Sequence, residues 1–343
     1  MGIIIAILIF SFIVIFHEMG HFLLAKLNGI EVSEFALGMG PLLLSKEYKG
    51  TRYCIRALPI GGACVMGEDE EATGEELNFH SKSVLARISV IAAGPVFNFV
   101  LAFVLSVIII LLAGYDKPVA YVVNEGSPAA EAGMEDGDLI VRMGRKKINI
   151  FREISVYNQF HQGEAVNVTY IHEGETHTVR IKPEYNEELD YYLLGIGRGP
   201  NEEADLFKAL QYSFYEVKYA ISSTISGLSA LFTGQVGFDQ MMGPVGIVGM
   251  VGETYKSSAD YGWLVILVNV LNISIILSAN LGVMNLLPIP ALDGGRLVFL
   301  FAEALRRKRI DPEKEGYVHF IGFALLMALM VFVLYNDIRR LFL

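Results

Sequence analysis

Three runs of residues without a charged side chain restrict the possible folds of this chain more than any other feature. Residues 88–115 contain no Asp, Glu, Lys or Arg and lie between Arg87 and Asp116. Residues 262–292 and 317–335 are the other two runs. A helix needs roughly 20 apolar residues to cross a hydrocarbon core of about 30 Å, so each run is long enough to span a membrane.

The first 29 residues predict a fourth membrane helix. Residues 2–16 are uniformly apolar, and apolar side chains resume at Phe22 after a polar interruption. A signal peptide would begin with basic residues and end at a cleavage site of small residues, and neither feature is present. We therefore expect a polytopic α-helical membrane protein with four transmembrane helices and an inserted β-rich domain.

Composition agrees with this fold class and excludes others. The chain is 53% hydrophobic and 19% charged, whereas soluble domains have roughly 45–50% apolar and about 25% charged residues. A net charge of −10 argues against nucleic acid as a partner. Two cysteines, Cys54 and Cys64, exclude a disulfide-rich scaffold or a metal cluster of several cysteines.

The charged segments between the apolar runs predict the domain organisation. Basic residues concentrate between the first and second spans and between the third and fourth, which places both connections in the cytosol. The expected order is helix 1–29, a cytosolic segment 30–87 with a re-entrant β-hairpin, helix 88–115, an extracytoplasmic domain 116–200, juxtamembrane amphipathic helices 201–261, helix 262–292, a cytosolic connection 293–316 and helix 317–337.

Residues 116–200 alternate apolar and polar side chains in short runs, which predicts strands. Within them Ser127 is placed to cap a short helix that begins at Pro128 and ends at Gly133. This pattern resembles the PDZ domains of bacterial envelope proteases. The resemblance implies that Leu194, Gly195 and Ile196 form the loop that holds a peptide carboxylate, with the peptide added as a strand. The alternative is a small β-rich domain that binds no peptide.

The polar interruption of the first helix is His17-Glu18-Met19-Gly20-His21. Residues i and i+4 share one face of a helix, so His17 and His21 can hold one zinc ion. Glu18 is placed to accept a proton from the attacking water. Two histidines and a glutamate inside an apolar span cost several kcal/mol unless they have partners, which favours a metal site over two buried core histidines.

A catalytic zinc site needs a third protein ligand, and Asp293 is the best candidate. It follows Pro288 and Pro290, which prevent a regular helix at the end of the third apolar run. Irregular backbone at membrane depth is tolerated where it is buried in protein or lines a wet cavity. The alternative is that Asp293 merely caps a helix that starts at Gly294.

Together these motifs resemble the site-2 protease family, peptidase family M50, of intramembrane zinc metalloproteases. A single PDZ-like insert resembles the regulator-of-sigma-E-protease type. The resemblance implies zinc as cofactor, His17, His21 and Asp293 as ligands and Glu18 as general base.

The resemblance further implies that Asn98 and Asn285 hold the substrate backbone or the oxyanion, although asparagines also link membrane helices through hydrogen bonds. It implies a bacterial plasma membrane and single-span membrane proteins as substrates, such as anti-sigma factors or remnant signal peptides.

Two other functions remain open at this stage. A membrane-anchored PDZ scaffold would bind peptides without cleaving them. A small transporter would use the same polar residues as an ion path, but the two halves of the chain show no repeat of the His or Asn pattern.

Overall fold

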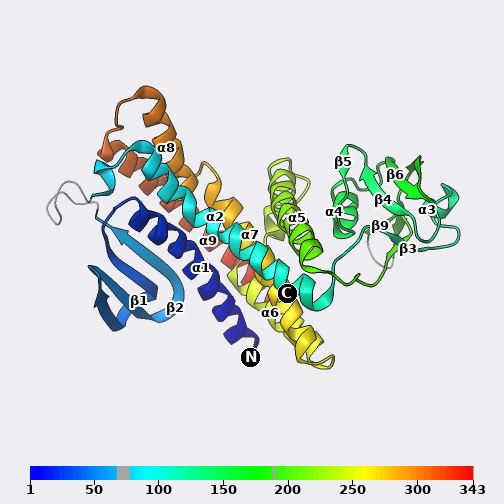
Figure 1. Cartoon of the computed structure of the whole chain (residues 1–343), viewed down its shortest axis with the longest axis horizontal. Coiled ribbons are helices and arrows are strands. Elements are labelled where there is room, and N and C mark those ends of the chain that lie inside the picture. The colour runs from blue at the N-terminus through cyan, green and yellow to red at the C-terminus, as the bar shows by residue number, and fades with distance from the viewer. Residues whose placement is uncertain (68–77, 188–190, 343) are drawn as a thin grey trace. The chain divides into compact units, whose positions relative to one another are not determined.

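The computed structural model describes residues 1–67, 78–187 and 191–342, and the chain divides into two units (Figure 1). Met1–Leu105 and Gly234–Leu343 form the first unit, and Ser106–Thr233 form the second. Parts of two predicted segments, residues 68–77 of 30–87 and 188–190 of 116–200, lie outside the described residues.

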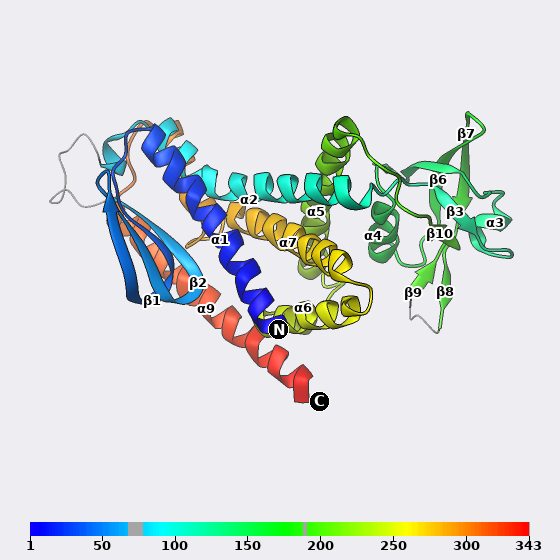
Figure 2. The same ribbon diagram turned by 60° about the horizontal axis from the view of Figure 1, so that its bottom comes forward.

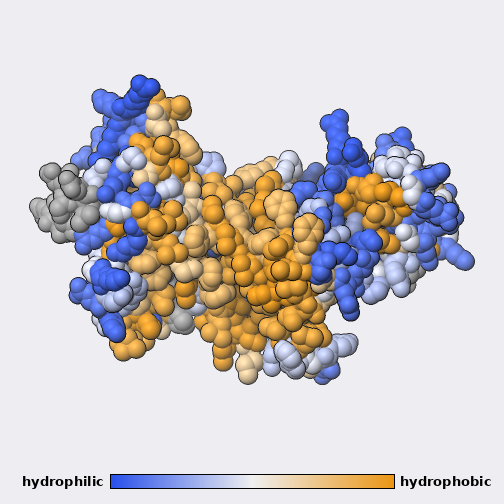
Figure 3. Space-filling view, in the orientation of Figure 1, coloured by the Kyte–Doolittle hydropathy of each residue, from blue (hydrophilic) through white to orange (hydrophobic). Residues whose placement is uncertain are grey.

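Among the described residues, four helices are long and apolar enough to cross a membrane. They are α1 (Gly2–Leu27), α2 (Val84–Ala113), α7 (Trp263–Leu286) and α9 (Pro312–Phe342). The prediction of a helical membrane protein with four spans is confirmed at this level. Figure 3 shows the apolar surface that these helices present, as expected of groups that face lipid rather than water.

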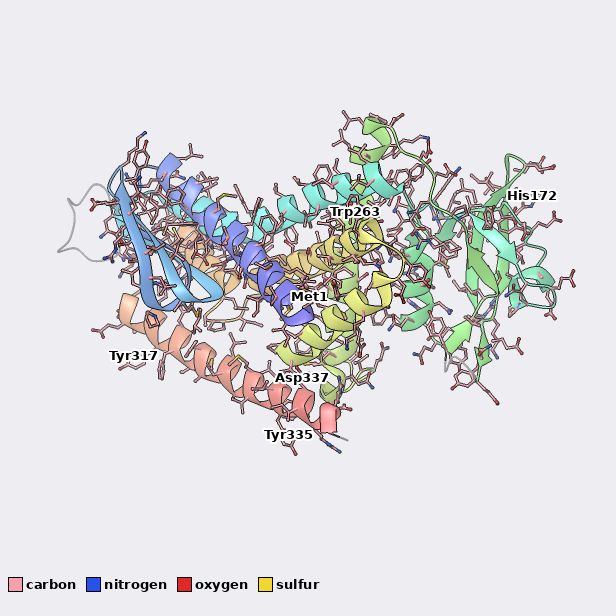
Figure 4. The ribbon with its side chains drawn as sticks, turned by 90° about the horizontal axis from the view of Figure 1, so that it is seen from below. Met1, His172, Trp263, Tyr317, Tyr335 and Asp337 are labelled. Atoms are coloured by element: carbon pink, nitrogen blue, oxygen red, sulfur yellow. The ribbon has the colours of Figure 1, made fainter. Side chains whose placement is uncertain are left out.

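The helix α9 carries tyrosines at both ends of its apolar stretch. Tyr317 and Tyr335 are strongly exposed and lie 18 residues apart (Figure 4). At a rise of 1.5 Å per residue they are separated by about 27 Å, close to the thickness of a hydrocarbon core. Tyrosines at this spacing match the aromatic belts at the two membrane surfaces.

A long antiparallel hairpin follows α1. Its strands are β1 (Val32–Tyr48) and β2 (Thr51–Met66), and it packs along α1 (Figure 2). At its base the Glu34 carboxylate is bonded by Arg56 and by Arg52 (2.6 Å). These two guanidinium groups lower the pKa of Glu34 below its ordinary value, with the Arg56 bond as the largest cause.

The remaining helices of the first unit are α6 (Pro244–Ala259) and α8 (Asp293–Arg306), with short 3₁₀ turns at Phe79–Ser81 and Phe238–Gln240. The carboxylate of Asp337, near the end of α9, accepts bonds from the N–H groups of Gly243 (3.0 Å) and Gly246 (2.9 Å) (Figure 4). These N–H groups at the start of α6 lack partners within their own helix, so α9 supplies the cap.

The second unit is rich in short strands. One sheet has the order β5-β4-β6-β7, and two strand pairs join β10 to β3 and β8 to β9. The strands are β3 (Ala120–Val123), β4 (Leu139–Met143), β5 (Lys146–Lys147), β6 (Val166–His172), β7 (Glu175–Ile181), β8 (Glu184–Asn186), β9 (Tyr191–Leu193) and β10 (Ile196–Arg198). The helix α3 (Pro128–Glu131) starts at Ser127, whose hydroxyl accepts a bond from the Ala130 N–H, as predicted.

Two further helices complete the second unit, α4 (Arg152–Phe160) and α5 (Leu206–Phe232). Arg152 at the start of α4 bonds the buried Glu216 carboxylate on α5. Burial raises the pKa of Glu216, while the Arg152 charge opposes that rise. Phe207 and Phe214 of α5 are strongly exposed.

Candidate active site

Two buried histidines face one another on α1. His17 and His21 are 7% and 6% exposed, on a helix that is otherwise almost entirely apolar. Their ring centroids are 4.8 Å apart and the Nε2 atoms are 3.2 Å apart. The spacing of four residues puts both rings on one helix face, as the sequence predicted.

Asp293 reaches the histidine pair through an irregular connection. The helix α7 ends at Leu286, because a residue before proline disfavours helical backbone and Pro288 follows closely. Ala291 has a positive φ of 75°, and its N–H donates to His319 Nδ1 on α9 over 2.8 Å. Asp293 is then the first residue of α8, and Leu292 occupies the cap position.

The three candidate ligand atoms have the spacing of a tetrahedral site. Asp293 Oδ2 lies 3.2 Å from His17 Nε2 and 3.5 Å from His21 Nε2, and the two Nε2 atoms are 3.2 Å apart. Two atoms that bind one tetrahedral zinc ion at about 2.0–2.1 Å lie about 3.3–3.4 Å from each other. The three side chains therefore fit one zinc ion, with a fourth position left for a reactant.

Hydrogen bonding at the site also fits a cation. A carbonyl oxygen only accepts, and His21 Nδ1 lies 2.9 Å from the Val90 carbonyl oxygen, so Nδ1 carries the proton. In the neutral ring Nε2 then offers a lone pair towards Asp293. Asp293 Oδ2 is buried and has no hydrogen-bond partner among the described residues. A buried carboxylate facing imidazole lone pairs is costly without a positive charge.

Glu18 lies beside the hairpin. A methyl group placed on Gly62 of β2 would lie 3.0 Å from Glu18 Cγ, so the strand passes close to this side chain. Glycine at position 62 leaves room for the glutamate. Glu18 thus follows His17 directly on α1 and lies next to a strand.

The two candidate asparagines contact opposite edges of the same ring. Asn98 on α2 is fully buried, and its Nδ2 lies 3.1 Å from His17 Nδ1. Asn285 near the end of α7 is partly buried, and its Nδ2 lies 3.5 Å from His17 Nε2, the ligand atom. Asn285 is therefore on the same side of the ring as Asp293, and Asn98 is at the other ring nitrogen.

The candidate peptide-binding loop belongs to the second unit. Leu194 is 5% exposed, and its carbonyl oxygen accepts a bond from the Ala129 N–H of α3. The Gly195 carbonyl accepts a bond from Asn124, and Ile196 pairs with Val123 in the β10–β3 ladder. The loop is thus tied to the start of α3 by its carbonyl groups.

Sequence reasoning missed three residues of α2 and α7 that support the site. The Val90 carbonyl orients His21, Gly94 faces both rings, and Ser278 Oγ donates to the Asn98 carbonyl oxygen (2.8 Å). A main-chain carbonyl has no signature in sequence. Gly94 lies four residues before Asn98 on the same face of α2, and a glycine without a side chain likewise carries no sign of the rings it faces.

Comparison with known proteins agrees with this site. The family model described as peptidase family M50 matches residues 5–329. A chain from Clostridium acetobutylicum is 38% identical over 338 residues, with 98% of this chain and 97% of the relative covered.

Two relatives from Bacillus species are named as proteases. Zinc metalloprotease RasP of Bacillus licheniformis is 33% identical over 420 residues, and regulator of sigma-W protease RasP of Bacillus subtilis is 33% identical over 421 residues. Each alignment covers 98% of this chain and 98% of the relative. His17, His21 and Asp293 lie together, and the chain matches the family over nearly its whole length. This chain therefore belongs to peptidase family M50, the site-2 protease family of intramembrane zinc metalloproteases.

Proposed function

We propose that this chain hydrolyses peptide bonds in single-span membrane proteins, with His17, His21 and Asp293 as zinc ligands and Glu18 as general base. The observation that carries the proposal is the tetrahedral spacing of three candidate ligand atoms, two from α1 and one from the first residue of α8. When bound, zinc supplies Lewis acidity at the attacked carbonyl and acidifies the attacking water.

Glu18 then performs the proton transfers. It accepts the proton of the water that attacks the carbonyl carbon and delivers it to the leaving amine. Asn285 is placed to donate a hydrogen bond to the carbonyl oxygen as negative charge develops there, since its Nδ2 lies on the ligand side of His17.

A substrate helix must unwind before this attack, because its amides are already bonded within the helix. The β1–β2 hairpin beside Glu18 offers a place for the unwound segment. Its strand side chains Met39, Leu44, Ile55 and Leu58 are exposed and apolar. An extended substrate segment added along the hairpin would regain main-chain hydrogen bonds next to the general base.

The Bacillus subtilis relative is named for the regulation of sigma-W. By extension we propose anti-sigma factors as substrates of this chain, and remnant signal peptides as a second class. The chain would lie in a bacterial plasma membrane with the metal site towards the cytosol. Arg306 at the end of α8 and Arg307, Lys308 and Arg309 directly after it support this orientation.

Residues 116–200 would form a PDZ-like domain outside the cytosol. The short helix capped by Ser127 and the loop 194–196 beside it support this interpretation. Such a domain would either dock the newly exposed end of a trimmed substrate or exclude substrates with large outer domains.

The test is cleavage of a tagged single-span peptide by the purified chain in detergent. Wild type should cut within the span, and 1,10-phenanthroline should stop it. Glu18→Gln should keep its zinc and lose about 10²–10⁴-fold in rate. Glu253→Gln, an exposed glutamate of α6, is the matched control and should cleave normally. Undiminished cleavage by Glu18→Gln would contradict the assignment of the base. Zinc binding without any cleavage would favour the peptide-binding scaffold.

A further inference from the structure

The helix α2 contacts the outer edges of both histidine rings. The Val90 carbonyl lies at Nδ1 of His21, and the Asn98 amide lies at Nδ1 of His17. Both contacts are buried, and they fall on either side of Pro95, which lies inside the helix. One helix thus provides a partner for each ring nitrogen that does not face Asp293.

The partner of His21 sets its proton position without ambiguity. The Val90 carbonyl can only accept, so Nδ1 donates and Nε2 is left with its lone pair. A histidine that binds a metal through one nitrogen normally donates from the other to such a partner.

His17 needs the same arrangement. Its Nε2 faces Asp293 Oδ2 and His21 Nε2, so Nε2 is the ligand atom and the proton of the neutral ring belongs on Nδ1. That N–H requires an acceptor, and the described group within reach is the Asn98 amide at 3.1 Å. An amide presents either its oxygen or its NH₂ after half a turn of the group. Asn98 Oδ1 is buried and makes no hydrogen bond to any described residue, so the oxygen is available for this role.

We propose that Asn98 is a positioning residue for the zinc site, its amide oxygen accepting the Nδ1–H bond of His17 and so directing Nε2 to the metal. The main chain of Asn98 is itself fixed by the Ser278 hydroxyl of α7. This inference rests on the proposed role of His17 as a ligand, and not on the substrate or on cleavage.

The location of Asn98 separates this role from the one expected from family resemblance. Asn98 is fully buried, and the imidazole ring of His17 lies between its amide and the ligand atom. A donor for the oxyanion must reach the side of Nε2. Asn285 is on that side, 3.5 Å from His17 Nε2. Of the two asparagines, only Asn285 is therefore placed for the role that the resemblance implied for both.

Asn98→Asp and Asn98→Leu separate the alternatives, because a carboxylate accepts hydrogen bonds but cannot donate them, and leucine does neither. Zinc affinity is measured on the purified full chain in detergent by competition with a chelating dye, and cleavage is measured separately over a range of zinc concentrations. Asn285→Leu is the matched control on the other edge of the same ring.

We expect Asn98→Leu to bind zinc about 10–100-fold more weakly and to regain cleavage as zinc is added. Asn98→Asp should bind zinc within about threefold of wild type and should cleave. Asn285→Leu should bind zinc normally. If Asn98→Leu binds zinc like wild type, or if Asn98→Asp is loaded with zinc but inert, Asn98 does not position His17. If Asn98→Leu does not fold, the isosteric Asn98→Asp alone decides between acceptor and donor. Failure of the proposed proteolysis would appear differently, as normal zinc binding by wild type with no cleavage.

Discussion

Gly94 offers the sharpest test of the proposed metal site, because a side chain added there would meet both histidine rings. It lies on α2, one turn before Asn98. A methyl group at this position would lie 2.6 Å from Cε1 of His21 and 2.7 Å from Cε1 of His17, and closer still to His21 Nε2. Ordinary contact begins at 3.4 Å. Gly94→Ala therefore requires the His21 ring to move by more than 0.8 Å and the His17 ring by about 0.7 Å.

These displacements are large compared with what coordination tolerates. Metal–ligand distances in a functional site are held within about 0.2 Å, so each ring would move roughly four times that limit. The change touches the ligands themselves, so zinc affinity should fall at least as far as it does for changes behind the ligands, about 10–100-fold. Overpacking should also lower the free energy of unfolding by about 1–3 kcal/mol.

The assay is zinc content of the purified variant after dialysis against a weak chelator, followed by cleavage of the single-span peptide. Gly249→Ala on α6 is the control, since a methyl group there meets no atom within 4 Å. It should retain full zinc and activity. A Gly94→Ala protein that holds one zinc ion with wild-type affinity would refute the geometry on which the site assignment depends.

Two further perturbations test electrostatic contacts outside the metal site. Arg87 of α2 bonds both oxygens of Glu303 on α8 (3.1 and 2.5 Å), and both side chains are nearly buried. Arg87→Met leaves the buried Glu303 carboxylate without its partner and should lower the free energy of unfolding by about 3–5 kcal/mol. The double variant Arg87→Met/Glu303→Leu should regain most of that stability. Equal thermal midpoints for the single and double variants would contradict this. In the second unit His172 Nδ1 lies 2.7 Å from the Asp138 carboxylate, and this bond raises the pKa of His172 above 6.5 (Figure 4). A raised folded-state pKa means that the contact stabilises the fold below pH 6.5 and is lost as pH rises through the folded value. Hydrogen exchange of the β6 and β7 amides should therefore show less protection as the pH rises from about 6 to about 9. His172→Gln should remove this pH dependence. An unchanged pH profile in the variant would show that the His172–Asp138 contact is not its cause.

The sequence was most informative where chemistry depends on neighbours along the chain. The four apolar helices follow from long runs without charge, because lipid accepts no unpaired charge or open backbone. The two imidazoles share a face because four residues make about one helical turn. Ser127 at the start of α3 was predicted for the same reason, since a cap bonds the backbone three residues later.

Residues that are far apart in the sequence but meet in the fold could be predicted only in part. Asp293 could be nominated because prolines and an acid at membrane depth are unusual, but its 3.2 Å approach to His17 spans 276 positions of sequence. Asn98 and Asn285 looked equivalent from sequence, and the structure separates them by the edge of the ring that each one meets.

By itself, the sequence determined the four apolar helices, which of them carries the histidine pair and which kind of metal such residues hold. Tertiary structure alone decided which nitrogen of each histidine faces Asp293, and it placed the Val90 carbonyl, the Asn98 amide and Gly94 beside the two rings. The physical reason is that a main-chain carbonyl and an absent side chain carry no residue signature of their function. They act only through where the packing of α2 against α1 places them.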